Sequence, residues 1–269
     1  MMRLAAGIPV LIALSMLSSC TPSELSHSKA ILGAVLIDGA GGPPLSDSVV
    51  VVAGGRIRGA GPRSNVPVPA EADQINGAGK FIVPGLIDVS RGSRIKKVDT
   101  SVSLGEMESA RAGKIPVIAS IATQADVATL VDRGATGFFG MVPDTEKLDA
   151  ALVSRLRNLH IFFAPLLARN RAMHNTEHLF RAGVPIAAAS SGGDLQSELE
   201  LLVEAGVPPL DVIVAATRNS AAAVGELEQS GTIETGKRAD LLLLSANPGE
   251  DIRNLRQVVL RMVEGEWVR

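Results

Sequence analysis

The residues best suited to metal or nucleophilic chemistry are four histidines and one cysteine, spread over a chain of 269 residues. His174 and His178 stand four residues apart, so on a helix they would share one face and offer two metal ligands. His27 and His160 have no such neighbour. Because no carboxylate or third histidine is identified beside the pair, surface histidines are the simpler interpretation. A serine nucleophile has a similar difficulty, since no histidine is placed to activate one.

The single cysteine closes an N-terminal segment with the features of an export signal. Arg3 precedes an apolar run at residues 8–17, which is too short to span a bilayer. The run ends in Leu-Ser-Ser-Cys at residues 17–20, which resembles a bacterial lipobox, where a peptidase cuts before an acylated cysteine. The alternative is an ordinary secretory signal with an incidental cysteine, although a lone thiol in an exported protein invites oxidation.

The lipobox predicts how the N-terminus is processed. We expect residues 1–19 to be a lipoprotein signal peptide, Cys20 to be the lipidation site and residues 20–29 to form a tether. Thr21 stands where an aspartate is associated with inner-membrane retention. We therefore expect an exported protein, lipid-anchored in the bacterial cell envelope, with the outer membrane favoured.

Composition excludes one class of partner. The formal net charge is −2, only 3% of residues are aromatic, and the chain has one tryptophan and no tyrosine. Binding to nucleic acid requires a cationic surface and usually stacking platforms, and this sequence supplies neither. We expect no nucleic-acid partner.

The elements that must position any site begin with a β-rich region. From Ala30 to Ile82, strand-like runs such as Ala34–Ile37 and Ser48–Val52 alternate with turns rich in glycine and proline. The paired glycines Gly54-Gly55 predict a hairpin, because they tolerate the positive φ angles of a two-residue turn.

Beyond about Pro84, apolar runs alternate with helical stretches about every 20 to 25 residues, a rhythm typical of βα units around a parallel sheet. The expected strands are Phe81–Val89, Arg94–Val98, Pro116–Ala122, Gly137–Val142, Ile161–Leu167 and Pro185–Ala189. The expected helices are Leu104–Ala112, Ala125–Arg133, Thr145–Asn158 with Asp144 as its cap, Thr176–Ala182, Leu195–Glu204 and Pro209–Val224. The β pattern returns at Ala239–Leu244 and Gln257–Val268, so the β module is expected to be split between the two ends of the chain.

Several stretches in order carry a family resemblance. They are residues 77–88 (Gly-Ala-Gly-Lys-Phe-Ile-Val-Pro-Gly-Leu-Ile-Asp), 182–187 (Ala-Gly-Val-Pro-Ile-Ala), 215–221 (Ala-Ala-Thr-Arg-Asn-Ser-Ala) and 231–241 (Gly-Thr-Ile-Glu-Thr-Gly-Lys-Arg-Ala-Asp-Leu). Together they resemble the amidohydrolase superfamily, in its imidazolonepropionase-like and prolidase-like branch. The resemblance implies a (β/α) barrel flanked by a small β-sandwich built from both termini.

The predicted fold class is therefore α/β, an incomplete TIM-like barrel of about six strands with a small β-sandwich formed from the N- and C-terminal segments. The N-terminal half of the sandwich is expected at residues 30–80, the shortened barrel at 81–225 and the C-terminal half of the sandwich at 226–269. The barrel region is short compared with the roughly 250 residues of a full barrel. The resemblance implies that two βα units of the family fold are missing between Gly92 and Lys96. An open sheet exposes its edges, so we expect a second copy, a protein partner or the membrane face to cover the gap.

The resemblance also implies a metal site whose ligands are substituted here. Family members hydrolyse C–N or related bonds with one or two divalent metals at the C-terminal ends of barrel strands. The His-x-His motif falls on Ser90 and Gly92, and later histidines fall on Ser120 and Gly140. Ser191 occupies the place of the aspartate that binds metal and handles the proton of the attacking water. With these replacements we expect no cofactor, and zinc or another divalent metal only if hydrolysis is retained.

Lys96 is the one candidate remnant, because some family members carry a carboxylated lysine bridging two metals at a similar point. The alternative interpretation is that Lys96 is an ordinary solvated lysine beside Lys97.

These substitutions favour a non-catalytic relative, an exported lipoprotein with a ligand-binding or scaffold role. Ser90, Ser120, Ser190 and Ser191 would make the former metal pocket small and polar. The alternative is a hydrolase of non-peptide C–N bonds or peptide-like substrates with an atypical metal site. A third reading, a decaying coding sequence whose product need not fold stably, is countered by coherent helix and turn signals.

Overall fold

The computed structural model describes residues 28–268. Cys20, the expected signal peptide and His27 lie outside the described residues. Among the residues that are described, no helix is long and apolar enough to cross a membrane.

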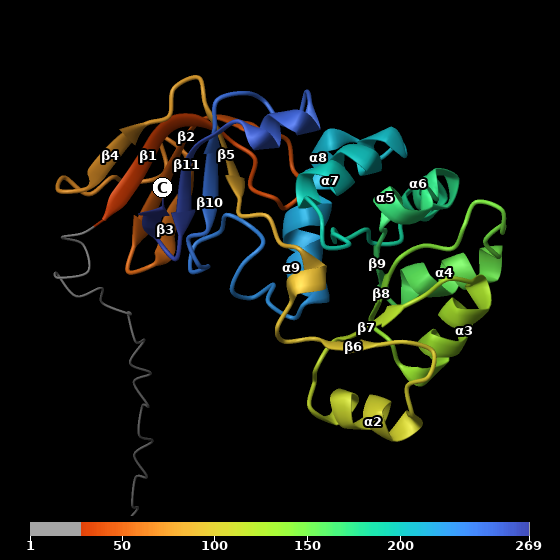
Figure 1. The fold of residues 1–269 in the computed structure, drawn as a ribbon. Helices are drawn as coiled ribbons and strands as arrows, with labels where there is room; N and C mark the ends of the chain where they lie inside the picture. The colour runs from red at the N-terminus through yellow and green to blue at the C-terminus, as the bar shows by residue number, and fades with distance from the viewer. Residues whose placement is uncertain (1–27, 269) are drawn as a thin grey trace, which may run out of the picture.

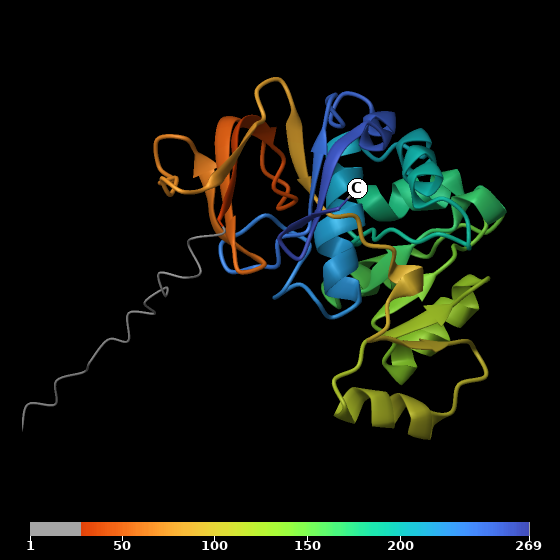
Figure 2. The same ribbon diagram turned by 60° about the vertical axis from the view of Figure 1, so that its left-hand side comes forward.

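One sheet contains both ends of the described chain. Its strands are β1 (Lys29–Leu36), β2 (Leu45–Ala53), β3 (Arg56–Pro62), β4 (Asp73–Asn76), β5 (Phe81–Pro84), β10 (Leu241–Leu244), β11 (Val258–Val263) and β12 (Glu266–Val268). The strand order is β12-β11-β10-β5-β1-β2-β3, and β4 pairs with β1. The antiparallel pairing of β5 with β10 joins the N-terminal strands to the C-terminal ones, which lie side by side in both views (Figures 1 and 2).

Two features of this sheet follow from its sequence. Gly54 and Gly55 have φ angles of +59° and +73° and close the β2–β3 hairpin, as the paired glycines predict. The apolar side chains of one face, among them Val50, Ile57 and Leu243, are buried in a core of their own.

The second sheet is parallel and lies among helices. Its strands are β6 (Lys96–Val98), β7 (Val117–Ser120), β8 (Gly137–Phe139) and β9 (Phe162–Ala164), hydrogen-bonded in chain order. The helices around it are α2 (Leu104–Ala112), α3 (Gln124–Arg133), α4 (Ala150–Asn158), α5 (Leu167–Asn170), α6 (Met173–Arg181) and α7 (Leu195–Glu204). A further helical stretch, which contains α8 (Pro209–Val214), the π-helical turn η2 (Ala215–Asn219) and α9 (Ser220–Ala223), runs between the two sheets (Figure 1).

The parallel sheet has fewer strands than the sequence pattern indicates. The run Phe81–Val89 is a strand only as far as Pro84, and β5 pairs within the terminal sheet. Beyond it, the amides of Gly85, Ile87 and Val89 donate to three different partners, the carbonyls of Asp240, Ala216 and Ala188. Backbone that bonds to a different element at each step bridges the two sheets and cannot form a ladder.

The last expected strand is also absent as a ladder. Pro185–Ala189 makes a single parallel bridge, between Phe163 and Ile186. Within residues 28–268 the parallel sheet therefore has four strands, with β6 and β9 at its edges, instead of about six.

The helix expected at residues 145–158 is α4 (Ala150–Asn158), so the expected start is wrong. Asp144 does not cap it; Asp149 does, by accepting a hydrogen bond from the amide of Leu152 at 2.9 Å. The Glu146 carboxylate instead accepts from the amide of Gln124, and Asp144 accepts from the amides at the start of α6. These contacts between distant segments hold residues 144–148 out of the helix.

The main core lies between the parallel sheet and its helices. Phe138 on β8 and Phe163 on β9 are essentially fully buried, and their ring centroids are 5.1 Å apart. On the other face of the sheet a smaller cluster joins Ile118 and Phe139 to Val89 and Val224. The segment after β5 and the end of α9 therefore cover that face.

Candidate functional site

Asp88 lies at the centre of the region that contains the substituted ligand positions Ser90 and Gly92. It precedes the 3-10 turn η1 (Val89–Arg91), and its side chain is only 9% exposed. Its Oδ1 accepts hydrogen bonds from the Ser90 amide at 2.9 Å, the Ser90 hydroxyl at 2.6 Å and the Ser190 amide at 3.1 Å. Its Oδ2 accepts from the Ser190 hydroxyl at 2.6 Å. One carboxylate thus ties together two loops 102 residues apart in the chain.

The two serines differ in their surroundings. Ser190 is 3% exposed, whereas Ser191, the expected position of the family base, lies at the exposed surface. The Asp88 cluster therefore contains Ser90 and Ser190 and not Ser191. Since both hydroxyls donate to Asp88, neither has its proton free for another acceptor.

The two lysines of β6 point in different directions. Successive side chains of a strand lie on opposite faces. Lys96 forms an exposed ion pair with Glu106 of α2 at 3.2 Å, and Lys97 donates to the Ser90 carbonyl at 2.5 Å. Lys97 thus lies beside the Asp88 cluster, where Arg91 pairs with the Asp88 carboxylate at 3.6 Å, whereas Lys96, the expected remnant, is held at the surface.

Two of the former ligand positions have no room for an imidazole. A Cβ on Gly92 would lie 2.9 Å from a methyl carbon of Val224. Gly140 has a φ of +86°, which L side chains rarely adopt, and its Cβ would meet the Ile121 carbonyl oxygen at 3.0 Å. At Gly140 the backbone itself favours glycine, whereas at Gly92 the Val224 side chain takes the space.

The remaining candidates do not complete a metal site. Ser120 is exposed at the end of β7, and His160, His174 and His178 are all exposed. Within residues 28–268, no three His, Cys, Asp or Glu side chains lie where they could hold one metal ion. The donors present do not fit the divalent metal that the sequence resemblance implies, because hydroxyls and glycines are poor replacements for imidazole and carboxylate ligands.

Glu198 on α7 is a buried acid that the sequence analysis did not single out. It is 4% exposed and accepts a hydrogen bond from the Ala168 amide at 3.2 Å. Burial raises the pKa of Glu198; hydrogen bonds from the amides of Ala168 and Leu167 oppose this shift, and the nearby negative charge of Asp88 adds to it. Its signal in the sequence is an acid beside Leu199 and Leu202 on the buried face of the helix.

The raised pKa of Glu198 predicts a pH-dependent gain from Glu198→Gln. The folded chain holds this proton more tightly than the unfolded one, so the contribution to stability is full below about pH 4.5 and is lost as the pH rises through the folded pKa. Glutamine cannot ionise and keeps an acceptor for Ala168. We expect Glu198→Gln to be more stable than wild type in urea unfolding at pH 7.5, with the difference closing below pH 4.5.

The exposed Glu204 on the same helix gives the matched control. Glu204→Gln should change stability little at either pH. A Glu198→Gln variant that is less stable than wild type at pH 7.5 would show that the ionised carboxylate stabilises the fold.

The sequence has known relatives. A family model described as "Amidohydrolase family" matches residues 119–268. Ochratoxinase of Aspergillus niger is 40% identical over 78 residues, 27% of this chain and 16% of that protein. Imidazolonepropionase of Thermoplasma acidophilum is 33% identical over 94 residues, 32% of this chain and 23% of that protein. The matched stretches thus span less than a quarter of the length of these curated relatives.

Solved structures share the fold. A crystal structure of a putative prolidase from Bifidobacterium longum aligns with a TM-score of 0.77 and 20% identity, covering 90% of this chain and 95% of that one. The crystal structure of A. niger ochratoxinase aligns with a TM-score of 0.76 and 16% identity, again over 90% and 95%. At these identities the likeness is one of fold alone.

Proposed function

Because the chain belongs to the amidohydrolase family, we propose that it is a non-hydrolytic member of that family, an exported lipoprotein that uses the retained fold to bind a ligand or partner. The family match covers more than half of the 269 residues. Family members usually bind a divalent metal, so the proposal depends on what has replaced that metal.

The observation that carries the proposal is the Asp88 cluster. Ser90 and Ser190 satisfy both carboxylate oxygens of Asp88 with hydrogen bonds, and Nε of Arg91 lies 3.6 Å from Oδ2, so groups of the chain itself compensate the charge. Val224 and the Ile121 carbonyl fill the space that side chains at Gly92 and Gly140 would need. Reversion of one residue would not rebuild a metal site, which supports loss of the hydrolytic function rather than its adaptation.

The proposal predicts how the purified protein responds to metal. Residues 21–269, incubated with zinc or manganese and desalted, should retain well under one equivalent by elemental analysis. Their cooperative thermal unfolding should not shift, because a ligand that does not bind the folded state cannot stabilise it.

A His174→Ala/His178→Ala variant is the control for weak binding at the exposed histidine pair. Metal that disappears in this variant comes from the surface pair and leaves the proposal intact. One or two tight equivalents that persist in it and raise the unfolding temperature would contradict the proposal.

The second candidate function is hydrolysis of a non-peptide C–N bond or a peptide-like substrate. It is favoured by the electrostatic interaction between Asp88 and the buried Glu198, because a carboxyl with a raised pKa is suited to general acid–base work. The structural neighbours described as prolidase and ochratoxinase suggest substrates for a screen. Turnover that is lost in Glu198→Gln would support this candidate over the first.

We also propose that the parallel sheet is a shortened barrel whose open side is covered by a second copy or a protein partner. Among the described residues, β6 has a neighbour on one side only. An unpaired strand edge is a ready site for association. The mass of the protein in solution tests this, since a monomer at all concentrations would leave only a different protein or the membrane as the cover.

A further inference from the structure

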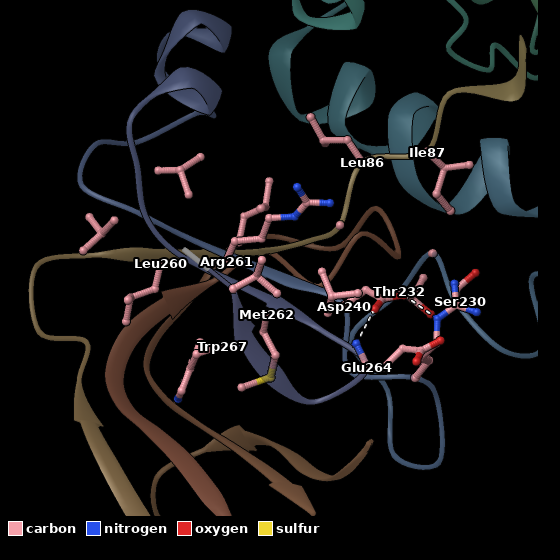
Figure 3. Close-up of a pocket in the computed structure, with 18 of the residues that line it drawn as sticks. Leu86, Ile87, Ser230, Thr232, Asp240, Leu260, Arg261, Met262, Glu264 and Trp267 are labelled. Carbon is pink, nitrogen blue, oxygen red and sulfur yellow. Dashed lines mark hydrogen bonds and ion pairs between the residues drawn. The ribbon is translucent and has the colours of Figure 1, made fainter. Parts of the chain in front are cut away.

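A cavity separate from the Asp88 cluster opens beside the last two strands. Its volume is about 1040 Å³, at the upper end for small-molecule sites. It is lined by β11, β12, residues 85–87 and the polar stretch that precedes β10, and neither Asp88 nor Ser90 nor Ser190 lines it (Figure 3).

Strand register places one cation among apolar side chains on this cavity's wall. Arg261 on β11 pairs with Val268 on β12, whereas Met262 pairs with Trp267, so the two pairs face opposite sides of the sheet. Val259 lies on the Arg261 side, two residues earlier. Val259 and Val268 are each 44% exposed, which is unusual for valine in a sheet.

The charges lining the cavity are separated into two groups. Arg238 is hydrogen-bonded to Asp240 and paired with Glu226 at 3.7 Å, so its charge is already neutralised. Arg261 is exposed and has no hydrogen bond or ion pair through its side chain within residues 28–268. In Figure 3 its guanidinium extends toward Leu86, away from Asp240 and Glu264.

We propose that this cavity binds an amphiphilic monocarboxylate, with its head group on Arg261 and its apolar tail over Val259, Val268 and Leu86. A guanidinium binds a carboxylate with two parallel hydrogen bonds, and the exposed valines supply the apolar surface that a tail would cover. The acids Glu226, Asp240 and Glu264 line the same cavity and disfavour a doubly charged head such as a phosphate. This site does not depend on the proposed loss of hydrolysis.

The test uses dodecanoate as the probe and calorimetric titration of residues 21–269, which include every element of the fold. We expect saturable binding at one site, with dodecan-1-ol at least tenfold weaker because it lacks the charge. Arg261→Gln should weaken dodecanoate binding about tenfold or more, the loss of one charge-assisted interaction.

Arg157→Gln, which removes an exposed arginine of α4 outside the cavity, is the matched control and should bind as wild type does. Equal binding of dodecanoate and dodecan-1-ol, or no effect of Arg261→Gln, would overturn the head-group assignment. Absence of saturable binding would overturn the site. A dimer that dissociates on Val259→Glu, without dodecanoate binding, would assign the face to a second copy and overturn the proposal as well.

Discussion

Replacing Asp88 with alanine should lower the free energy of unfolding by about 2–4 kcal/mol. Four hydrogen bonds from Ser90 and Ser190 end on this carboxylate, and bonds to a charged group are worth about 1.5–3 kcal/mol each before compensation. The loss leaves the buried Ser190 hydroxyl without its acceptor. For a chain of this size, the unfolding temperature should fall by roughly 5–15 °C, measurable by calorimetry.

The chain contains a matched control for this experiment. Asp99 makes the same two hydrogen bonds to the residue two positions on, Ser101, but both are exposed. Asp99→Ala should therefore cost much less stability than Asp88→Ala, because water replaces the lost acceptor. Similar losses for both variants would show that burial and the link to Ser190 contribute nothing.

A double-mutant cycle tests whether the two loops are joined through Asp88. If they are, Ser190→Ala should cost much less in the Asp88→Ala background than in wild type, since its acceptor is already gone. Additive losses would mean that the hydrogen bonds between Ser190 and Asp88 contribute nothing to stability. Asp88→Asn, which keeps an acceptor but removes the charge, should fall between wild type and alanine.

The Asp88 cluster shows how a buried carboxylate is compensated beside the substituted ligand positions. In a site built around a cation, a carboxylate without the cation is a destabilising buried charge. Here hydroxyl and amide donors from η1 and the Ser190 loop compensate that charge together with Arg91, whose Nε lies 3.6 Å from Oδ2 of Asp88. The cationic Lys97 bonds to the carbonyl of Ser90. The charge of Asp88 is therefore compensated by groups of the chain itself.

Local sequence patterns predict much of the fold. Leu104–Ala112 and Leu195–Glu204 are helices at the expected bounds, because each begins at a side-chain cap, Ser103 and Asp194 respectively. The expected strand residues that form no ladder are 85–89 and 185–189. Residues 85–89 are as apolar as a strand, and only the positions of Asp240, Ala216 and Ala188 decide that they bridge instead.

Only part of the candidate site can be predicted from the sequence. The motif identifies Ser90 and Gly92 as positions next to Asp88, yet the partner of Asp88 is Ser190 and not the adjacent Ser191. Likewise Lys97, and not Lys96, lies beside the cluster. Since neighbouring residues of extended backbone face opposite ways, an offset of one residue changes which side chain reaches a site.

Replacing Cys20 with alanine should move the protein from the membrane fraction to the soluble fraction, by at least about tenfold in their ratio. Each buried methylene of an acyl chain contributes about 0.8 kcal/mol, so two or more chains on one cysteine give stable anchoring. The measurement is fractionation of bacteria that express the full chain, with detection of the protein in each fraction. Ser19→Ala keeps a small residue before the cleavage site and should leave the protein in the membrane fraction.

The outcomes separate the two interpretations of the N-terminus. If wild type and Cys20→Ala are both soluble, the cysteine is incidental and the segment is an ordinary secretory signal. If both stay with membranes after a high-salt wash, which removes electrostatic attachment, another anchor holds the protein. Only loss of anchoring in Cys20→Ala alone supports a lipoprotein.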